Sequence, residues 1–187
     1  MTCLEARPLL QFKLQTGREV MRVPHFDAIR QQKILLKRKL LQTQAVVNLL
    51  VNTGDNVEEF KNVRVGSKSP AASLIKTHFY VPGTQTQDKN FITMQSRVIY
   101  TDSNVVKETC ITVYIICNEH QIDLLQGSRA DLLADEVDRI LNNGGNPLFG
   151  LGGIALSTAI EVQFNEGYSG WQIPYVTHER NQDKELL

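Results

Sequence analysis

The sequence predicts an α+β protein with a mostly antiparallel sheet of about four to five strands flanked by helices. Two segments, 26–52 and 129–142, repeat apolar residues at helical spacing. Three others, 92–100, 107–117 and 154–164, are apolar or alternating runs typical of strands. The first helical block precedes the strands and the second is inserted among them, which favours the α+β class.

The length of 187 residues is sufficient for one domain with a real core. We assign that domain to residues 25–177. Residues 1–24 have weak periodicity and contain Gly17 and Pro24, so they are predicted to be an N-terminal arm or extension. The polar residues 178–187 are predicted to be a flexible C-terminal tail.

The segment 26–52 is predicted to form two helices or one kinked helix. Asp27 is a candidate cap for the first helix and Thr43 for the second. The apolar stripe of the first helix contains Ile29, Leu35, Leu36 and Leu40. The turn-forming residues 52–56 are expected to end the block.

Strands follow. Residues 75–81 alternate and precede Pro82 and Gly83, so a strand is expected there. The strand over 92–100 is predicted to point Arg97 toward solvent or a partner. The strand over 107–117 is apolar on both faces, which indicates a central position covered on its second face by a helix or partner.

The helix over 129–142 is expected to follow a near capping box that begins at Ser128. In the strand over 154–164, the even-numbered residues are predicted to share one face. Residues 167–170 are expected to turn, and 171–176 to form a last short strand.

No pattern for catalysis, a cofactor or a metal is found. The glycines of 144–153 resemble a phosphate loop, but they precede a strand and lack the GK[ST] signature. The chain has three cysteines, an odd number, and no CxxC pair. Cys110 and Cys117 lie in an apolar run, which predicts buried, reduced thiols. The acids of 131–138 are spread over an exposed face, where solvation or an interface is expected rather than acid–base chemistry.

The formal net charge is zero, but its distribution is uneven. Residues 1–52 hold nine basic and three acidic residues, so the remainder is acidic. Surfaces of opposite sign attract neighbouring copies of one chain. Candidate inter-subunit contacts are Arg30, Lys33, Lys37, Arg38 and Lys39 on the first helix and Asp131, Asp135, Glu136 and Asp138 on the second. Simple solvation, and non-specific proximity of the basic face to DNA, are the alternatives.

No apolar run reaches the roughly 18 residues that a membrane span requires. The first 22 residues are interrupted by charges and lack an apolar signal core. The expected location is therefore a cytoplasm, or a particle assembled in one.

The pattern over 107–176 resembles bacteriophage neck and tail-completion proteins. The similarity rests on the strand 112–117, the helical segment 127–141, Phe149-Gly-Leu-Gly-Gly153 with the alternating strand after it, and Gly167-Tyr-Ser-Gly-Trp171. A helical block ahead of the sheet also fits. It is a pattern of elements that covers 70 to 110 residues.

The resemblance implies a tail-terminator-like fold that assembles into a ring in the neck of a virion. Such a ring has no active site; it joins or terminates the tail at the head-side connector and leaves a channel for DNA. Its partners would be further copies, portal or adaptor proteins, other neck rings and tail proteins, with assembly in the host bacterial cytoplasm. A small cytoplasmic enzyme with a non-local active site and a tail tube or sheath-type subunit are the alternative functions.

Overall fold

The computed structural model describes residues 25–83, 88–100, 106–142 and 154–180. Three α-helices occupy the segments where helical periodicity predicted them. They are α1 (His25–Gln42), α2 (Gln44–Val51) and α3 (Arg129–Asn142). The break between α1 and α2 at Thr43 confirms two helices in the first block.

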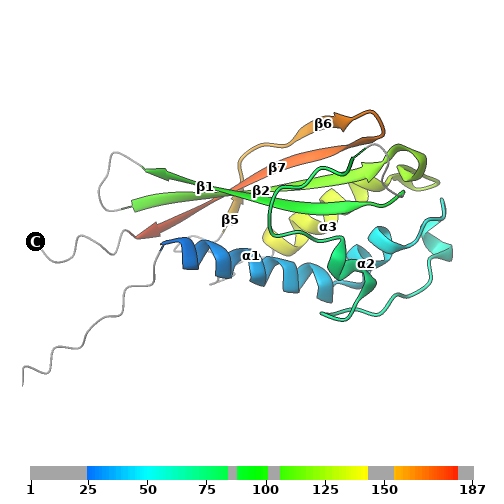
Figure 1. Ribbon diagram of the computed structural model, residues 1–187, viewed down its shortest axis with the longest axis horizontal. Coiled ribbons are helices and arrows are strands. Elements are labelled where there is room, and N and C mark those ends of the chain that lie inside the picture. The colour runs from blue at the N-terminus through cyan, green and yellow to red at the C-terminus, as the bar shows by residue number, and fades with distance from the viewer. Residues whose placement is uncertain (1–24, 84–87, 101–105, 143–153, 181–187) are drawn as a thin grey trace, which may run out of the picture.

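A five-stranded antiparallel sheet forms the second layer (Figure 1). Its order is β1-β2-β7-β5, and β6 pairs with β7 beside β5. Its strands are β1 (Phe91–Tyr100), β2 (Val106–Asn118), β5 (Ile154–Leu156), β6 (Ile160–Asn165) and β7 (Tyr168–Arg180). A separate two-stranded ribbon joins β3 (Asp123–Leu124) to β4 (Gly127–Ser128). The predicted α+β class is confirmed.

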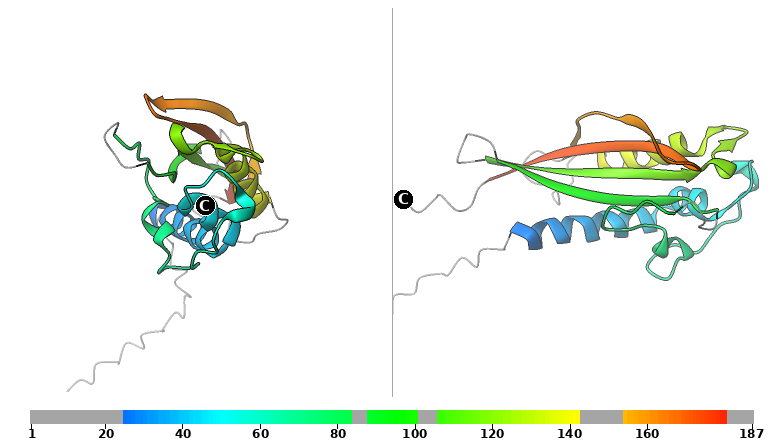
Figure 2. Two further views of the ribbon diagram at one scale, coloured as in Figure 1. Left: turned by 90° about the vertical axis from the view of Figure 1, so that its right-hand side faces the viewer. Right: turned by 45° about the horizontal axis from the view of Figure 1, so that its top comes forward.

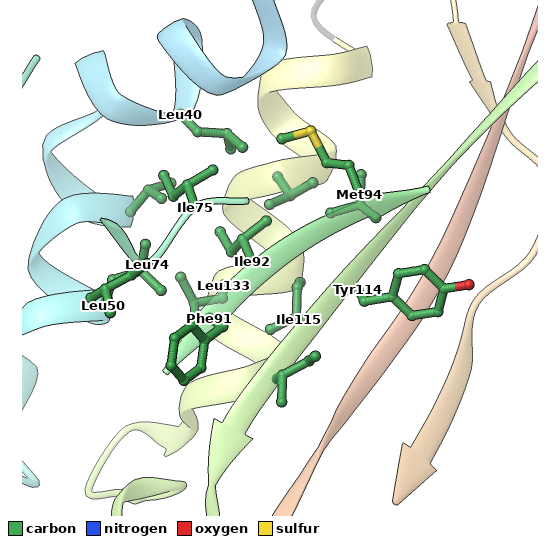
Figure 3. Packing of buried hydrophobic residues seen from close by; sticks show 14 of the residues in the cluster. Leu40, Leu50, Leu74, Ile75, Phe91, Ile92, Met94, Tyr114, Ile115 and Leu133 are labelled. Atoms are coloured by element: carbon green, nitrogen blue, oxygen red, sulfur yellow. The ribbon is translucent and has the colours of Figure 1, made fainter. Parts of the chain in front are cut away.

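The core lies between the helices and one face of this twisted sheet (Figures 2 and 3). β2 pairs with β1 on one side and β7 on the other, so its predicted central position is confirmed. Ile92, Val113 and Ile115 of the strands and Leu40 and Leu133 of the helices are fully buried. Because β2 alternates between two covered faces, almost every side chain from Cys110 to Cys117 leaves water.

Aromatic side chains cover much of the opposite face of the sheet. Tyr114 points away from the helices (Figure 3), and its ring lies 4.6 Å from Phe79 and 6.2 Å from Phe164. Phe91 contacts Tyr80 in the same way, at 5.4 Å between ring centroids. Tilted and edge-on rings at such distances are favourable pairs. The second cover predicted for β2 is therefore supplied by the chain itself.

The strand predicted over 75–81 is wrong. Only Ile75 bridges to Ile92 of β1, with Lys76 N donating to Ile92 O at 2.8 Å. The chain then leaves the edge of β1, and two consecutive aromatic residues, Phe79 and Tyr80, both pack toward the sheet. A strand would send consecutive side chains to opposite faces, so this aromatic packing overrides the alternating pattern.

The single alternating face predicted for 154–164 is also wrong. In β5, Leu156 pairs with Tyr175, whereas in β6, Ile160 pairs with Gln172. Residues 157–159 therefore lie opposite only two residues of β7, which is one residue more than a regular ladder allows. The extra residue changes the phase of the alternation: Ile154 and Leu156 lie on the α3 side, and Phe164 lies on the aromatic side with Tyr114.

The predicted turn over 167–170 is shorter than expected. Glu166 and Gly167 alone form the turn, and β7 begins at Tyr168. β7 then continues to Arg180, beyond the predicted end at Val176 and into the predicted tail. The rest of that tail, the arm over 1–24 and the loop over 143–153 lie outside the described residues.

The predicted helix caps have mixed outcomes. Asp27 lies within the first turn of α1, not before it, and pairs with Arg30. Thr43 occupies the cap position of α2, but its hydroxyl donates to Lys39 O at 3.1 Å instead of accepting from the helix. Ser128 is a genuine cap of α3, because its Oγ accepts from Ala130 N.

Candidate interaction surfaces

A groove lies between α3 and the strands β5 and β7, with a volume of about 320 Å³. Three carboxylates recur along its α3 side at i, i+4 and i+7, the spacing of one helix face. Apolar side chains complete its lining. The residues of this acidic groove are Asp131, Ala134, Asp135, Asp138, Leu156, Ala159, Trp171, Ile173 and Tyr175.

Two aromatic residues of β7 orient two of the carboxylates. Trp171 Nε1 donates to Asp131 Oδ1 at 2.7 Å, and Tyr175 donates its hydroxyl proton to Asp138 Oδ1 at 3.1 Å. Burial, the Asp138 charge and this hydrogen bond together raise the pKa of Tyr175 well above its usual range. Trp171 and Tyr175 share a face because they are four residues apart on one strand. The groove therefore has a fixed aromatic wall and a fixed row of negative charge.

The four predicted acids do not form one surface. Asp131, Asp135 and Asp138 line the acidic groove, whereas Glu136 lies on the α2 side of α3 and pairs with Arg139. Asp135 is exposed and forms no ion pair with any of the described residues. Among the described residues, Asp131 and Asp138 accept hydrogen bonds only from neutral donors, so no described cation offsets the negative charge of the three carboxylates.

The five predicted basic residues lie on several sides of α1. Arg30, Lys33 and Lys37 follow the spacing of one helix face, whereas Arg38 and Lys39 point elsewhere. Lys37 Nζ donates to Ala72 O at 2.9 Å, and burial, with the nearby Lys76 charge, lowers its pKa. This hydrogen bond holds the Lys37 side chain against its own chain. Burial also lowers the pKa of Lys33.

Phe26, Ile29, Arg30 and Lys33 define what we call the α1 ridge, at positions i, i+3, i+4 and i+7. The Phe26 side chain is 84% exposed, the most exposed large apolar residue of the described chain. Arg30 Nε donates to Asp27 at 3.0 Å, so its charge is partly offset. Lys33 forms no ion pair with the described residues and supplies the net positive charge of the ridge.

The ridge and the acidic groove lie at opposite edges of the sheet. The ridge borders a hollow of about 460 Å³ whose other side is Thr77, two residues after the bridge from Ile75 to β1. The groove is lined by Leu156 of β5. Because β1 and β5 are the two ends of the sheet order, a positive apolar surface and a negative apolar surface lie near different edges of the sheet.

No group of three or more His, Cys, Asp or Glu residues is placed to hold a metal in the parts of the chain that the structure describes. Cys110 and Cys117 are free and buried, as predicted, and burial raises the pKa of Cys117 to about 12. None of the helices within the described ranges is long and apolar enough to cross a bilayer.

Residues 41–177 match the protein family YomW. This range includes all of the described sheet except the end of β7. The chain belongs to the YomW family. The name comes from a gene family of a Bacillus phage region, which indicates a phage-associated protein and agrees with the phage association expected from the sequence. None of the curated proteins compared with the chain matches it.

The YomW match begins at Leu41, so it includes the acidic groove but not the α1 ridge. Sequence reasoning found the three carboxylates of the groove but missed Leu156, Trp171 and Tyr175. Trp171 is 40 residues from Asp131, and no local pattern joins them. The exposure of Phe26 was not predictable, because a single aromatic residue at the start of a basic helix has the same pattern as a core residue.

Proposed function

We propose that this YomW-family protein is a structural component of a bacteriophage neck, assembled as a ring that joins or terminates the tail at the head-side connector. It acts without catalysis, and the ring leaves a channel through which DNA passes. Its partners are further copies of itself, portal or adaptor proteins, and tail proteins. The location is the neck of the virion.

One observation carries the proposal: surfaces of opposite charge lie at the two edges of one sheet. A ring closes through heterologous contacts, in which one surface of a subunit meets a different surface of the next. A chain with its positive surface at the β1 edge and its negative surface at the β5 edge has the polarity that such contacts require. The phage association of the family supports the same context.

The test is the mass of the purified full chain by native mass spectrometry over a range of concentrations, with negative-stain images of the same samples. The expected result is a closed oligomer with an open centre. A compact monomer at every concentration, stabilised against heat by a small-molecule ligand, would overturn the proposal in favour of an enzyme. Long tubes of the wild-type chain would instead indicate a tail tube subunit.

Charge reversal tests the electrostatic part of the proposal. Replacing Lys37, Arg38 and Lys39 together by Glu is expected to weaken assembly, because it reverses the overall charge of α1, whose long-range field attracts an acidic neighbour. Lys37→Met is the control, since it removes the contact with Ala72 O without adding negative charge. Unchanged incorporation of the triple variant into particles would contradict the role of this charge.

A further inference from the structure

We propose that the α1 ridge of one copy docks into the acidic groove of a second copy, with Phe26 as the anchor inserted between α3 and β5. The inference rests on the proposed ring and specifies the two surfaces that form its repeating contact. The partner is a second copy of this chain, and the contact is head-to-tail.

The ridge has the form of a helix that binds in a groove. Phe26, Ile29, Arg30 and Lys33 follow the i, i+3, i+4, i+7 spacing with which amphipathic helices fill apolar grooves. Phe26 is 84% exposed at the start of α1, where burial on docking removes an aromatic surface from water. Buried aromatic anchors supply much of the affinity of protein interfaces.

The acidic groove matches this ridge in shape and chemistry. Its volume of about 320 Å³ accommodates an aromatic side chain, and Leu156, 44% exposed, offers an apolar contact. Asp131, Asp135 and Asp138 repeat at i, i+4 and i+7 along α3, so their row parallels the helical spacing of the ridge. Lys33 meets this row without a competing ion pair among the residues that the structure describes.

Docking within one chain does not fit the arrangement. The ridge lies near the β1 edge with Thr77, and the groove lies at the β5 edge, so β2 and β7 lie between the two edges. After the first contact forms, the copy that used its ridge still has a free groove, and the copy that used its groove still has a free ridge. Repetition of such a contact closes a ring when the rotation per subunit divides a full turn.

A mixing experiment with two full-length variants tests the contact. The ridge variant is Phe26→Ser with Lys33→Ser, and the groove variant is Asp135→Ser with Leu156→Ser. Each is expected to be monomeric alone, with association weakened at least about tenfold. A 1:1 mixture is expected to form a heterodimer, because the intact ridge of one variant meets the intact groove of the other.

Trp171 gives an independent readout. It is the single tryptophan of the chain and lines the groove, so docking of Phe26 is expected to shift its emission to shorter wavelength. The shift should occur in wild-type protein and in the mixture, and be lost in each variant alone. Thermal unfolding of each variant verifies that it is folded.

The matched control is Asp123→Ser with Leu125→Ser. It also removes one exposed carboxylate and one exposed leucine, 74% exposed in this case, but from neither surface. It should assemble as wild type does. Persistence of rings in the ridge or the groove variant, or a mixture that stays monomeric up to millimolar concentration, would overturn this contact while leaving the ring itself standing. A wild-type chain that never associates would overturn the ring as well.

Discussion

Arg129 Nη1 donates a 2.7 Å hydrogen bond to the main-chain oxygen of Leu49, 80 residues earlier in the chain. The same guanidinium also donates to the oxygens of Asn52, Gly54 and Gln121 at 2.7 to 2.8 Å, and lies over the ring of Phe60. Arg129 is fully buried at the start of α3. Its N–H donors therefore satisfy main-chain oxygens at the end of α2, and the side chain joins α2 to α3.

Arg129→Met is expected to lower the free energy of unfolding by roughly 3–5 kcal/mol, because several buried carbonyl groups lose their donor at once. Urea unfolding followed by circular dichroism measures the change. Arg139→Met on the same helix is the control; Arg139 is 65% exposed and forms an exposed pair with Glu136, so about 0.5 kcal/mol or less is expected. Similar losses for the two variants would contradict the role assigned to Arg129.

Gly170→Ala is expected to destabilise the protein severely, by about 3 kcal/mol or more. A Cβ at this position of β7 would lie 2.1 Å from Ile115 O on β2, in the centre of the sheet. Gly167→Ala separates this clash from backbone strain, since Gly167 has a similar φ of 151° but open space around it. Thermal unfolding of the two variants should differ clearly, and equal melting temperatures would mean that the close approach is not rigid.

The buried cysteines are expected to resist thiol reagents in the folded protein. Cys110 is 3% exposed and Cys117 is fully buried, and the raised pKa of Cys117 leaves little thiolate at pH 8. In the variant Cys3→Ser, reaction with Ellman's reagent at pH 8 should be slow in native protein and complete in urea. Rapid labelling without denaturant would show that β2 opens locally.

Substitutions in β6 test which of its side chains stabilises the sheet. Phe164→Ala should cost about 1–3 kcal/mol because the ring contacts Tyr114, whereas Ile160→Ala, at a side chain 52% exposed, should cost less than about 1 kcal/mol. Urea unfolding of both variants provides the comparison. A larger loss for Ile160→Ala would mean that the contact of Phe164 with Tyr114 is not the main packing contact of β6.

Local periodicity was sufficient for the parts of the fold that are regular. The helical spacing of α1 and α3 and the doubly apolar run of β2 each reflect one repeating environment, so their faces and the central position of β2 were predictable. The carboxylates at 131, 135 and 138 were recognised for the same reason. Their groove was not, because its other wall comes from β5 and β7.

Long-range contacts account for the failures. The alternating pattern after Ile75 predicts a strand, because Phe79 and Tyr80 are common strand residues. In the structure these two rings pack instead on Tyr114 and Phe91. The helix predicted over 129–142 begins at Arg129, but no local signal shows that the oxygens bound by this side chain lie near residues 49, 54 and 121. Such information is available only once the chain is folded.

The irregular link between β5 and β6 has a consequence for chain length. Residues 157–159 face only two residues of β7, so a ladder with one residue fewer would pair β5 and β6 with the same partners as now. A deletion within this link would preserve both strands, whereas a deletion inside β2 would move its side chains to the wrong face. Homologous chains can therefore differ by one residue here without altering the fold, and the size of Ala159 and its neighbours can change the width of the groove.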